Sequence, residues 1–318
     1  MLGVIQITPW HWAGFIVCVL VFLALDLGVF NRKAHVIKFH EALAWTGIWF
    51  ALAMLFALVI APMVVNDWQL KQTVDFITGY IIELSLSMDN VFVIAIIFAH
   101  FVVPDRYQHR VLFWGILGAL LMRGLMIWLG VELIHRFEWL LVALGAFLVF
   151  SGLKMVFTKE KESDPEKNIA VRLTRKFFPV STEFDGQKFL TRLNGRNALT
   201  PLALVLVLVE TTDLIFALDS IPAIFAVTTD SFIVFTSNVF AILGLRSLYF
   251  VLAGAIQYFR YLKFGLSIVL VFIGFKMVIV KYLHISTPLS LGIVVAIIAT
   301  SILASVITTR REEKSNHE

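Results

Sequence analysis

Cysteine and charge are both scarce in this sequence of 318 residues. Its single cysteine, Cys18, rules out a disulfide within the chain. Asp, Glu, Lys and Arg make up 15% of the residues, against roughly 25% in soluble globular proteins. The sequence also has no Walker loop, no nucleophile elbow and no HExxH motif, so nothing in it indicates an enzyme.

Hydrophobic residues are abundant instead, at 59% of the chain, with a mean hydropathy of +0.89. Several runs reach the roughly 20 apolar residues that are needed to cross a bilayer as a helix. The sequence therefore predicts an all-α polytopic membrane protein. We expect about nine spans, near residues 10–30, 41–64, 73–101, 110–131, 138–157, 199–226, 233–256, 262–280 and 287–308.

The basic residues of the short loops alternate between the two sides of the predicted bundle. One side carries Arg32, Lys33, Lys38, Arg106, Arg110, Arg260, Lys263, Arg310, Arg311 and Lys314. The short loops of the other side carry Lys71, Arg136 and Lys281. The positive-inside rule places the richer side in the cytoplasm, so we expect the N-terminus outside and the C-terminus inside a plasma membrane. This bias explains the net charge of +4, and no nucleic-acid partner is implied.

The longest polar segment, residues 158–198, lies on the predicted cytoplasmic side. Near its end, Asn194-Gly195 separates two short alternating segments, which is typical of a β-hairpin turn. We expect a small hairpin there, with an ordinary connecting loop as the alternative. The segment is also where a protein partner could bind.

The middle of the chain repeats itself. Leu148–Val156 and Leu270–Val278 are identical at seven of nine positions, and the Ile-Leu-Gly at 116–118 recurs at 242–244. The repeats cover residues 73–157 and 199–280, with three predicted spans each. An odd number of spans gives the two units opposite topology, which predicts a 3+3 inverted repeat. In transporters built this way, the binding site lies near the midplane between the repeats.

Two sets of acidic and amide side chains lie inside these apolar spans. They are Glu83, Asp89 and Asn90, and Glu210, Asp213 and Asp219. Each carboxylate at the bilayer centre costs about 2.5–3.5 kcal/mol on insertion scales. A bound cation is the simplest compensation, and Asp26, Ser220, Arg123 and Arg246 are possible accessory residues. We expect Asp89 and Asp213 to face one another.

Helical geometry adds a condition. On an ideal helix, a residue at i+6 is rotated by about 240° from the residue at i, which leaves the two side chains about 120° apart. Glu83 and Asp89 should therefore not face one cavity from a straight helix. Either the acids serve different surfaces, or the two spans are locally unwound. Pro222 favours a break in the second span.

The donors are carboxylate, amide and hydroxyl oxygens, with no histidine expected at midplane depth. Such sites suit Mg²⁺, Ca²⁺ and Mn²⁺ rather than copper or zinc. Met88 is the one possible soft ligand that we note, although packing is its more ordinary role. One alternative is a structural set of ion pairs, in which Arg123 and Arg246 neutralise the two acidic sets symmetrically. Another is a relay for protons alone.

Three segments resemble the TerC family of bacterial integral membrane proteins, and most closely its Alx-type branch. They are MDNVFV at 88–93, ETTDLIFALDSIPAIFAVTTD at 210–230 and TSNVFAILGLRSLYFVLAG at 236–254. The resemblance covers nearly the whole chain. It implies a role in Mn²⁺ export, within the wider superfamily of LysE-type exporters, and the family is historically linked to tellurium resistance. The family's acidic motif maps onto Glu83, Asp89, Asn90, Glu210, Asp213 and Asp219.

These inferences together predict a secondary transporter that exports divalent metal ions, Mn²⁺ foremost and Mg²⁺ or Ca²⁺ next, by proton antiport. Its partners would be the lipid bilayer and the transported ion, with no tightly bound cofactor, and the protein could form homo-oligomers. Two other classes stay open. One is a membrane scaffold in metal or tellurite stress that recruits a partner through the long loop. The other is a LysE-like exporter of an oxyanion or organic solute, which would depend on Arg123 and Arg246.

Overall fold

The computed structural model describes residues 6–25, 39–157, 168–193, 195–253, 261–280, 282–283 and 285–315. In this part of the chain the structure is almost entirely helical. The elements are α1 (Pro9–Leu25), α2 (Phe39–Leu55), the π-helix η2 (Phe56–Ile60), α3 (Ala61–Val64), α4 (Leu70–His100), α5 (Asp105–Arg136), α6 (Trp139–Phe157), α7 (Ile169–Phe177), β1 (Leu190–Leu193), β2 (Arg196–Leu199), α8 (Pro201–Phe225), α9 (Ser231–Ala253), α10 (Leu262–Ile279) and α11 (Thr287–Ser315).

The prediction of an all-α polytopic membrane protein is confirmed. In the described part of the chain, eight helical segments are long and apolar enough to cross a membrane, and α1 is a shorter apolar helix. One of these eight segments, Phe39–Val64, consists of α2, η2 and α3 together. Each segment corresponds to one of the expected spans.

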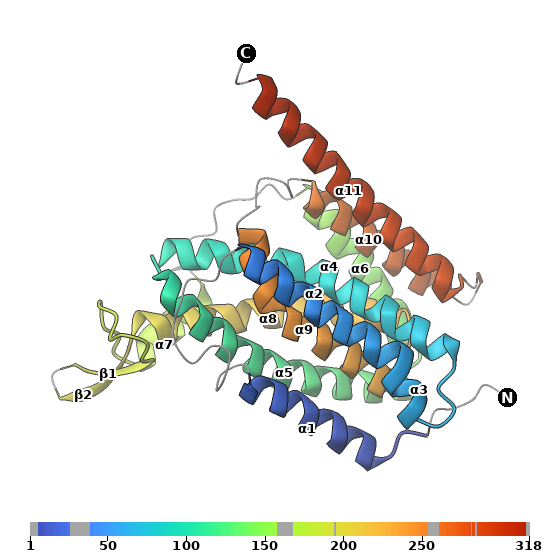
Figure 1. Ribbon diagram of the computed structural model, residues 1–318, viewed down its shortest axis with the longest axis horizontal. Coiled ribbons are helices and arrows are strands. Elements are labelled where there is room, and N and C mark those ends of the chain that lie inside the picture. The colour runs from blue at the N-terminus through green and yellow to red at the C-terminus, as the bar shows by residue number, and fades with distance from the viewer. Residues whose placement is uncertain are drawn as a thin grey trace.

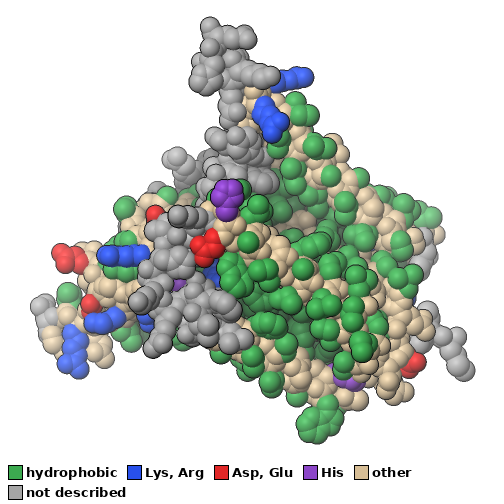
Figure 2. Space-filling model, in the orientation of Figure 1, with side chains coloured by type: hydrophobic (Ala, Val, Ile, Leu, Met, Phe, Trp, Pro, Cys, Tyr) green, Lys and Arg blue, Asp and Glu red, His purple; other side chains and the backbone are tan. Residues whose placement is uncertain are grey.

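The long helices form one bundle, from which α11 leaves at an angle (Figure 1). Apolar side chains cover most of the face shown in Figure 2, as expected for a surface in contact with lipid. Charged side chains gather at the end that carries the hairpin and at the tip of α11. The bundle is therefore built for a bilayer, with polar groups at its ends.

The two ends of the bundle are called the inner end and the outer end. The inner end is where α8 begins and where α7 and the hairpin lie; the outer end is where α4 and α11 begin and α8 and α10 end. The names follow the orientation predicted from the basic residues. Of those residues, Arg32, Lys33, Lys38 and Arg260 fall outside the described part of the chain.

Buried apolar side chains form three clusters that hold the bundle together. The first joins α1 and α2 to α4, α5 and α9. The second joins α4, α5, α6 and α8 to α10 and α11, and the third lies at the inner end, where Val171 fixes α7 against the bundle. Polar side chains inside the bundle are thus surrounded by apolar packing on every side.

Glycines let α6 and α10 approach closely. A Cβ atom on Gly152 would lie 3.1 Å from Cβ of Leu270, and one on Gly274 would lie 2.9 Å from Cβ of Leu148. In the repeated nonapeptide, Gly152 corresponds to Gly274 and Leu148 to Leu270. The two contacts therefore exchange when the repeats are exchanged. A twofold relation between the repeats predicts this exchange, and the inverted repeat itself stays a prediction.

Neither helix that carries the acidic sets is broken. The helix α4 is continuous from Leu70 to His100, and α8 is continuous from Pro201 to Phe225 with Pro222 inside it. The expected local unwinding, including the break at Pro222, is wrong for these segments. Pro222 lies in the last turn of α8, where the helix ends three residues later, so its missing N–H disturbs little of the hydrogen-bond ladder.

The segment before α8 contains the antiparallel pair β1–β2, at the place where the sequence predicts a hairpin. Gly195 has a φ of +77°, which suits glycine in a tight turn, and Asn194 lies outside the described residues. Beside the hairpin, hydrogen bonds from Thr191 and Lys188 lower the pKa of Asp185. These contacts tie the loop before β1 to the hairpin.

Candidate functional site

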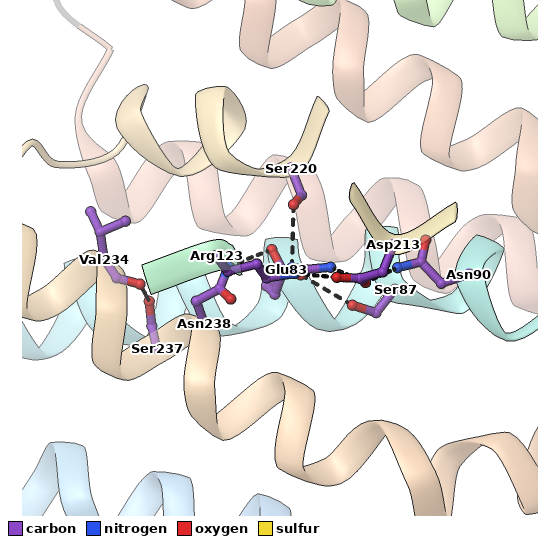
Figure 3. A network of polar contacts seen from close by, with 9 residues as sticks. All are labelled: Glu83, Ser87, Asn90, Arg123, Asp213, Ser220, Val234, Ser237 and Asn238. Carbon is purple, nitrogen blue, oxygen red and sulfur yellow. Dashed lines mark hydrogen bonds and ion pairs between the residues drawn. The ribbon is translucent and has the colours of Figure 1, made fainter. Parts of the chain in front are cut away.

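Arg123 of α5 lies at the centre of the buried polar network and is 1% exposed. It reaches Asp213 of α8 with two hydrogen bonds, from Nη2 to Oδ1 at 2.7 Å and from Nε to Oδ2 at 3.1 Å. Its Nη1 forms an ion pair with Glu83 of α4. Figure 3 shows the guanidinium between the two carboxylates. One cation thus links three helices.

Neutral polar side chains complete the hydrogen bonding of both acids (Figure 3). Glu83 accepts from Ser87 at 3.2 Å and from Asn238 of α9 at 3.0 Å. Asp213 accepts from the amide of Asn90 at 3.1 Å. Because every one of these side chains is buried, the network compensates charges that water cannot reach.

A small pocket opens beside Arg123. Its polar wall is formed by Glu83, Ser87, Asp89, Asn90, Arg123, Asp219 and Ser220, and its apolar wall by Leu86, Met155, Phe216 and Leu270. The space measures about 10 Å³, which is about what one water molecule needs. Three carboxylates and one guanidinium therefore border a space of single-ion size.

Two oxygen atoms of the pocket residues lack hydrogen-bond donors. Oδ1 of Asn90 and Oδ1 of Asp219 are both buried and have no partner among the described residues. Asn90 is 2% exposed, and its orientation is fixed by the bond from Nδ2 to Asp213. Buried acceptors without a partner are rare in proteins and indicate a missing ligand, ion or water.

The pocket is lined from corresponding positions on α4 and α8. The residues Leu86, Asp89 and Asn90 on α4 match Phe216, Asp219 and Ser220 on α8, each set at spacings of 3 and 4 residues. The expectation that Glu83 and Asp89 cannot face one cavity from a straight helix is wrong. The pocket extends around the side of α4, with Leu86 between the two acids. Glu83 and Asp89 therefore both line it, although their side chains point about 120° apart.

The remaining acidic residue of the motif, Glu210, lies apart from the pocket. Its carboxylate is pressed against Gly118 of α5, so closely that a Cβ atom at position 118 would collide with it. Its Oε2 is buried and has no hydrogen-bond partner in the described structure. Since α8 starts at the inner end, Glu210 lies one turn closer to that end than Asp213.

The other expected residues lie in different surroundings. Asp213 contacts Arg123 rather than facing Asp89 across the pocket, and Ser220 accepts from Arg123 Nη1 at 3.4 Å. Arg246 is buried, with Nη1 3.4 Å from Nδ1 of His109, whereas Arg123 joins Glu83 of one acidic set to Asp213 of the other. Asp26 lies outside the described residues.

Four side chains of the site were not among the residues predicted from the sequence. Ser87 and Asn238 donate to Glu83, Met155 lines the pocket, and Ser151 is a hydrogen-bonding neighbour of Asp219. A signal for Asn238 exists, because the tripeptide Asn-Val-Phe occurs both at 90–92 and at 238–240. Met88, the noted soft ligand, packs instead against apolar clusters.

Carboxylates alone do not make a metal site here. Among the described residues, no group of three His, Cys, Asp or Glu side chains is close enough to hold a metal ion. A cation in this pocket would therefore need the amide of Asn90 and the hydroxyls of Ser87 or Ser220 beside the carboxylates. This donor set of mixed oxygens fits a hard divalent cation.

Comparison with known proteins supplies the wider context. Residues 68–313 match the family model described as "Integral membrane protein TerC family". A Myxococcus xanthus protein named "Uncharacterized membrane protein STKORF319" is 51% identical, over 97% of this chain and 96% of its own length. The Escherichia coli K12 protein named "Putative membrane-bound redox modulator Alx" is 45% identical, over 96% of this chain and 97% of its own. No solved structure matches the chain.

Proposed function

The chain belongs to the TerC family of integral membrane proteins, a bacterial family of multi-pass proteins, and from that premise we propose that it is a secondary transporter for divalent metal ions. It exports them, Mn²⁺ above all, from the cytoplasm through the pocket beside Arg123. The supporting observation is the pair of buried acceptors, Asn90 Oδ1 and Asp219 Oδ1, that have no donor among the described residues, in a pocket bordered by three carboxylates. A cation is the ligand that supplies such oxygens with a partner.

In this proposal the pocket carboxylates Asp89 and Asp219 bind the ion from opposite repeats. Asn90 and Ser220 add an amide and a hydroxyl oxygen, and Glu83 is shared between the ion and Arg123. The guanidinium partly neutralises the negative charges of Glu83 and Asp213 whether or not the pocket holds an ion. This arrangement limits the charge that accumulates when the metal leaves.

The preference for Mn²⁺ over Mg²⁺ and Ca²⁺ is supported by the pocket's one sulfur. Met155 of α6 borders the same space as the oxygen donors. A thioether is a soft ligand that favours transition metals over Mg²⁺ and Ca²⁺, while the surrounding oxygens suit Mn²⁺ as well as those two ions. Zinc and copper would gain more from imidazole or thiolate groups, and neither lines this pocket.

Energy for export would come from an ion gradient, because the sequence has no nucleotide-binding motif. Metal binding requires deprotonated carboxylates, so protons that return to Asp89 and Asp219 from outside would drive release. Rocking of one repeat against the other would alternate the access, as in other transporters with inverted repeats.

Transport into liposomes tests this proposal. Purified protein should carry Mn²⁺ in preference to Mg²⁺ and Ca²⁺. Asp89→Asn and Asp219→Asn should each lower the initial rate on the order of tenfold or more, because each removes a charged ligand. Asp185→Asn, at a surface aspartate beside the hairpin, is the matched control and should keep the wild-type rate. Mn²⁺ movement that neither pocket variant slows would contradict the proposal.

The other classes have weaker support. An oxyanion would meet three carboxylates in the pocket and only one cation. The name of the Escherichia coli relative refers to redox modulation, yet this chain has one cysteine and so no dithiol pair of its own. A scaffold role would depend on the segment 160–176, whose residues 160–167 lie outside the described structure.

A further inference from the structure

A second, larger cavity lies at the outer end of the bundle. It measures about 520 Å³ and is bordered by the beginnings of α4 and α11 and the ends of α8 and α10. Its polar wall consists of Lys71, Asp75, Lys276, Ser286 and Thr287. The cavity can therefore hold many water molecules next to charged side chains.

Asp75 is the residue of this cavity that needs a partner. It is 3% exposed, and its Oδ1 has no hydrogen-bond partner in the described structure. Thr287 at the start of α11 is its hydrogen-bonding neighbour, and the charges of Lys71 and Lys276 act on it electrostatically, as does that of Asp230. Lys276 of α10 is itself only 8% exposed. A buried carboxylate with a free oxygen thus lies beside two ammonium groups.

The two cavities follow one another along the same helices. On α10, Leu270 borders the pocket beside Arg123 and Lys276 borders the outer cavity, about 9 Å further along at 1.5 Å per residue. On α4, Glu83 and Asp75 are separated by about 12 Å in the same way. Apolar side chains of these helices, such as Ile82 and Ile273, are buried between the two levels.

The charges that line the two cavities differ. Three carboxylates against one guanidinium leave two net negative charges at the pocket. Among the described residues, the wall of the outer cavity carries one carboxylate and two ammonium groups, and the charge of Asp230 also acts on Asp75. A divalent cation is thus held far less strongly at the outer cavity than at the pocket, and Asp75 is the carboxylate that the cavity offers it.

We propose that the outer cavity is a release station for the transported cation, in which Asp75 receives the ion and Lys276 expels it. The inference rests on the proposed function. The ammonium group of Lys276 is a cation tethered next to Asp75, and it competes with the metal for the same carboxylate. A low affinity at this station lets an ion leave the bundle instead of remaining bound at its outer end.

Equilibrium binding of Mn²⁺ to the purified full-length protein tests the release station. Wild type should bind Mn²⁺ at one site. Lys276→Gln should reveal a second site, or strengthen binding there on the order of tenfold, because a competing charge is removed. Lys276→Arg should behave as wild type, and the double variant Asp75→Asn with Lys276→Gln should lose the second site. Lys188→Gln, at an exposed lysine paired with Asp185, is the matched control.

The outcomes separate this inference from the proposed function. Wild type that neither binds nor carries Mn²⁺ would overturn both. Wild type that carries Mn²⁺ through Asp89, together with a Lys276→Gln variant that binds one equivalent at unchanged affinity, would overturn the release station alone. If Lys276→Gln fails to fold, a double variant that folds and still shows a second site would also overturn it. A second site that disappears with Asp75 would support it.

Discussion

Arg123 is the residue on which the buried network depends. Its guanidinium pairs with Glu83 and Asp213, and all three side chains are buried. A buried charge that loses its partner is far more costly than an exposed one, because neither water nor a counterion replaces the lost contact. The arginine is therefore as important to the fold as to the site.

Replacing Arg123 by glutamine should destabilise the protein by about 3–5 kcal/mol, because two carboxylates would remain buried without a cation. Unfolding by denaturant in detergent micelles, followed by tryptophan fluorescence, measures this loss. Arg311→Gln, at an exposed position near the end of α11, should leave the stability nearly unchanged. An Arg123→Gln protein as stable as this control would contradict the assigned role.

The acidic residues themselves were predictable, since carboxylates in an apolar span are conspicuous. Their partners were harder to foresee. Arg123 was expected only as an accessory residue or as one of two symmetric counterions, whereas it bridges both acidic sets. Whether a charge is neutralised by a metal or by an arginine depends on how the helices are rotated, and sequence spacing does not give that rotation.

At the scale of elements, the close contact of α6 with α10 depends on glycine. A Cβ atom at position 274 would lie 2.6 Å from the backbone oxygen of Gly145 and 2.8 Å from the backbone nitrogen of Val149. Backbone atoms cannot move aside as a flexible side chain does. The two helices would have to separate.

Gly274→Ala should therefore lower the free energy of unfolding by about 1–3 kcal/mol, the usual cost of overpacking. Gly292→Ala in α11 is the matched control, because no atom lies within 4 Å of the added methyl group. That control should be neutral or slightly stabilising, since alanine favours a helix by about 1 kcal/mol over glycine. Equal effects of the two substitutions would show that the α6–α10 contact is looser than described.

The helices α4 and α8, which carry the acidic residues, show which of these residues can line one pocket. Sequence reasoning offered unwinding or separate surfaces for residues six positions apart, and α4 and α8 are unbroken. The pocket instead borders a wide arc of α4, from Glu83 to Asp89, because α5, α6, α8 and α10 all contribute to its wall, whereas on α8 it is lined by Asp219 and not by Asp213. The width of a cavity depends on several helices, so a helical wheel of one helix cannot predict it.

At the scale of the whole molecule, the predicted orientation has a direct test. In a Cys18→Ser background, Asn66→Cys introduces a thiol between α3 and α4 at the outer end, and Thr182→Cys introduces one near the hairpin at the inner end. A membrane-impermeant maleimide should label the first in intact cells and the second only after permeabilisation. The reverse pattern would invert the predicted topology and with it the direction of transport.

By itself the sequence determined the class of the protein, the places of eight membrane-spanning segments, the acidic residues and the hairpin. These features follow from local hydropathy, local charge and turn chemistry, which each segment carries wherever it packs. Only the tertiary structure decided that Arg123 neutralises Glu83 and Asp213, that Met155 and Asn238 join the site, and that Glu210 does not border the pocket. These depend on how distant helices are rotated and how closely they approach, which packing of the entire bundle sets.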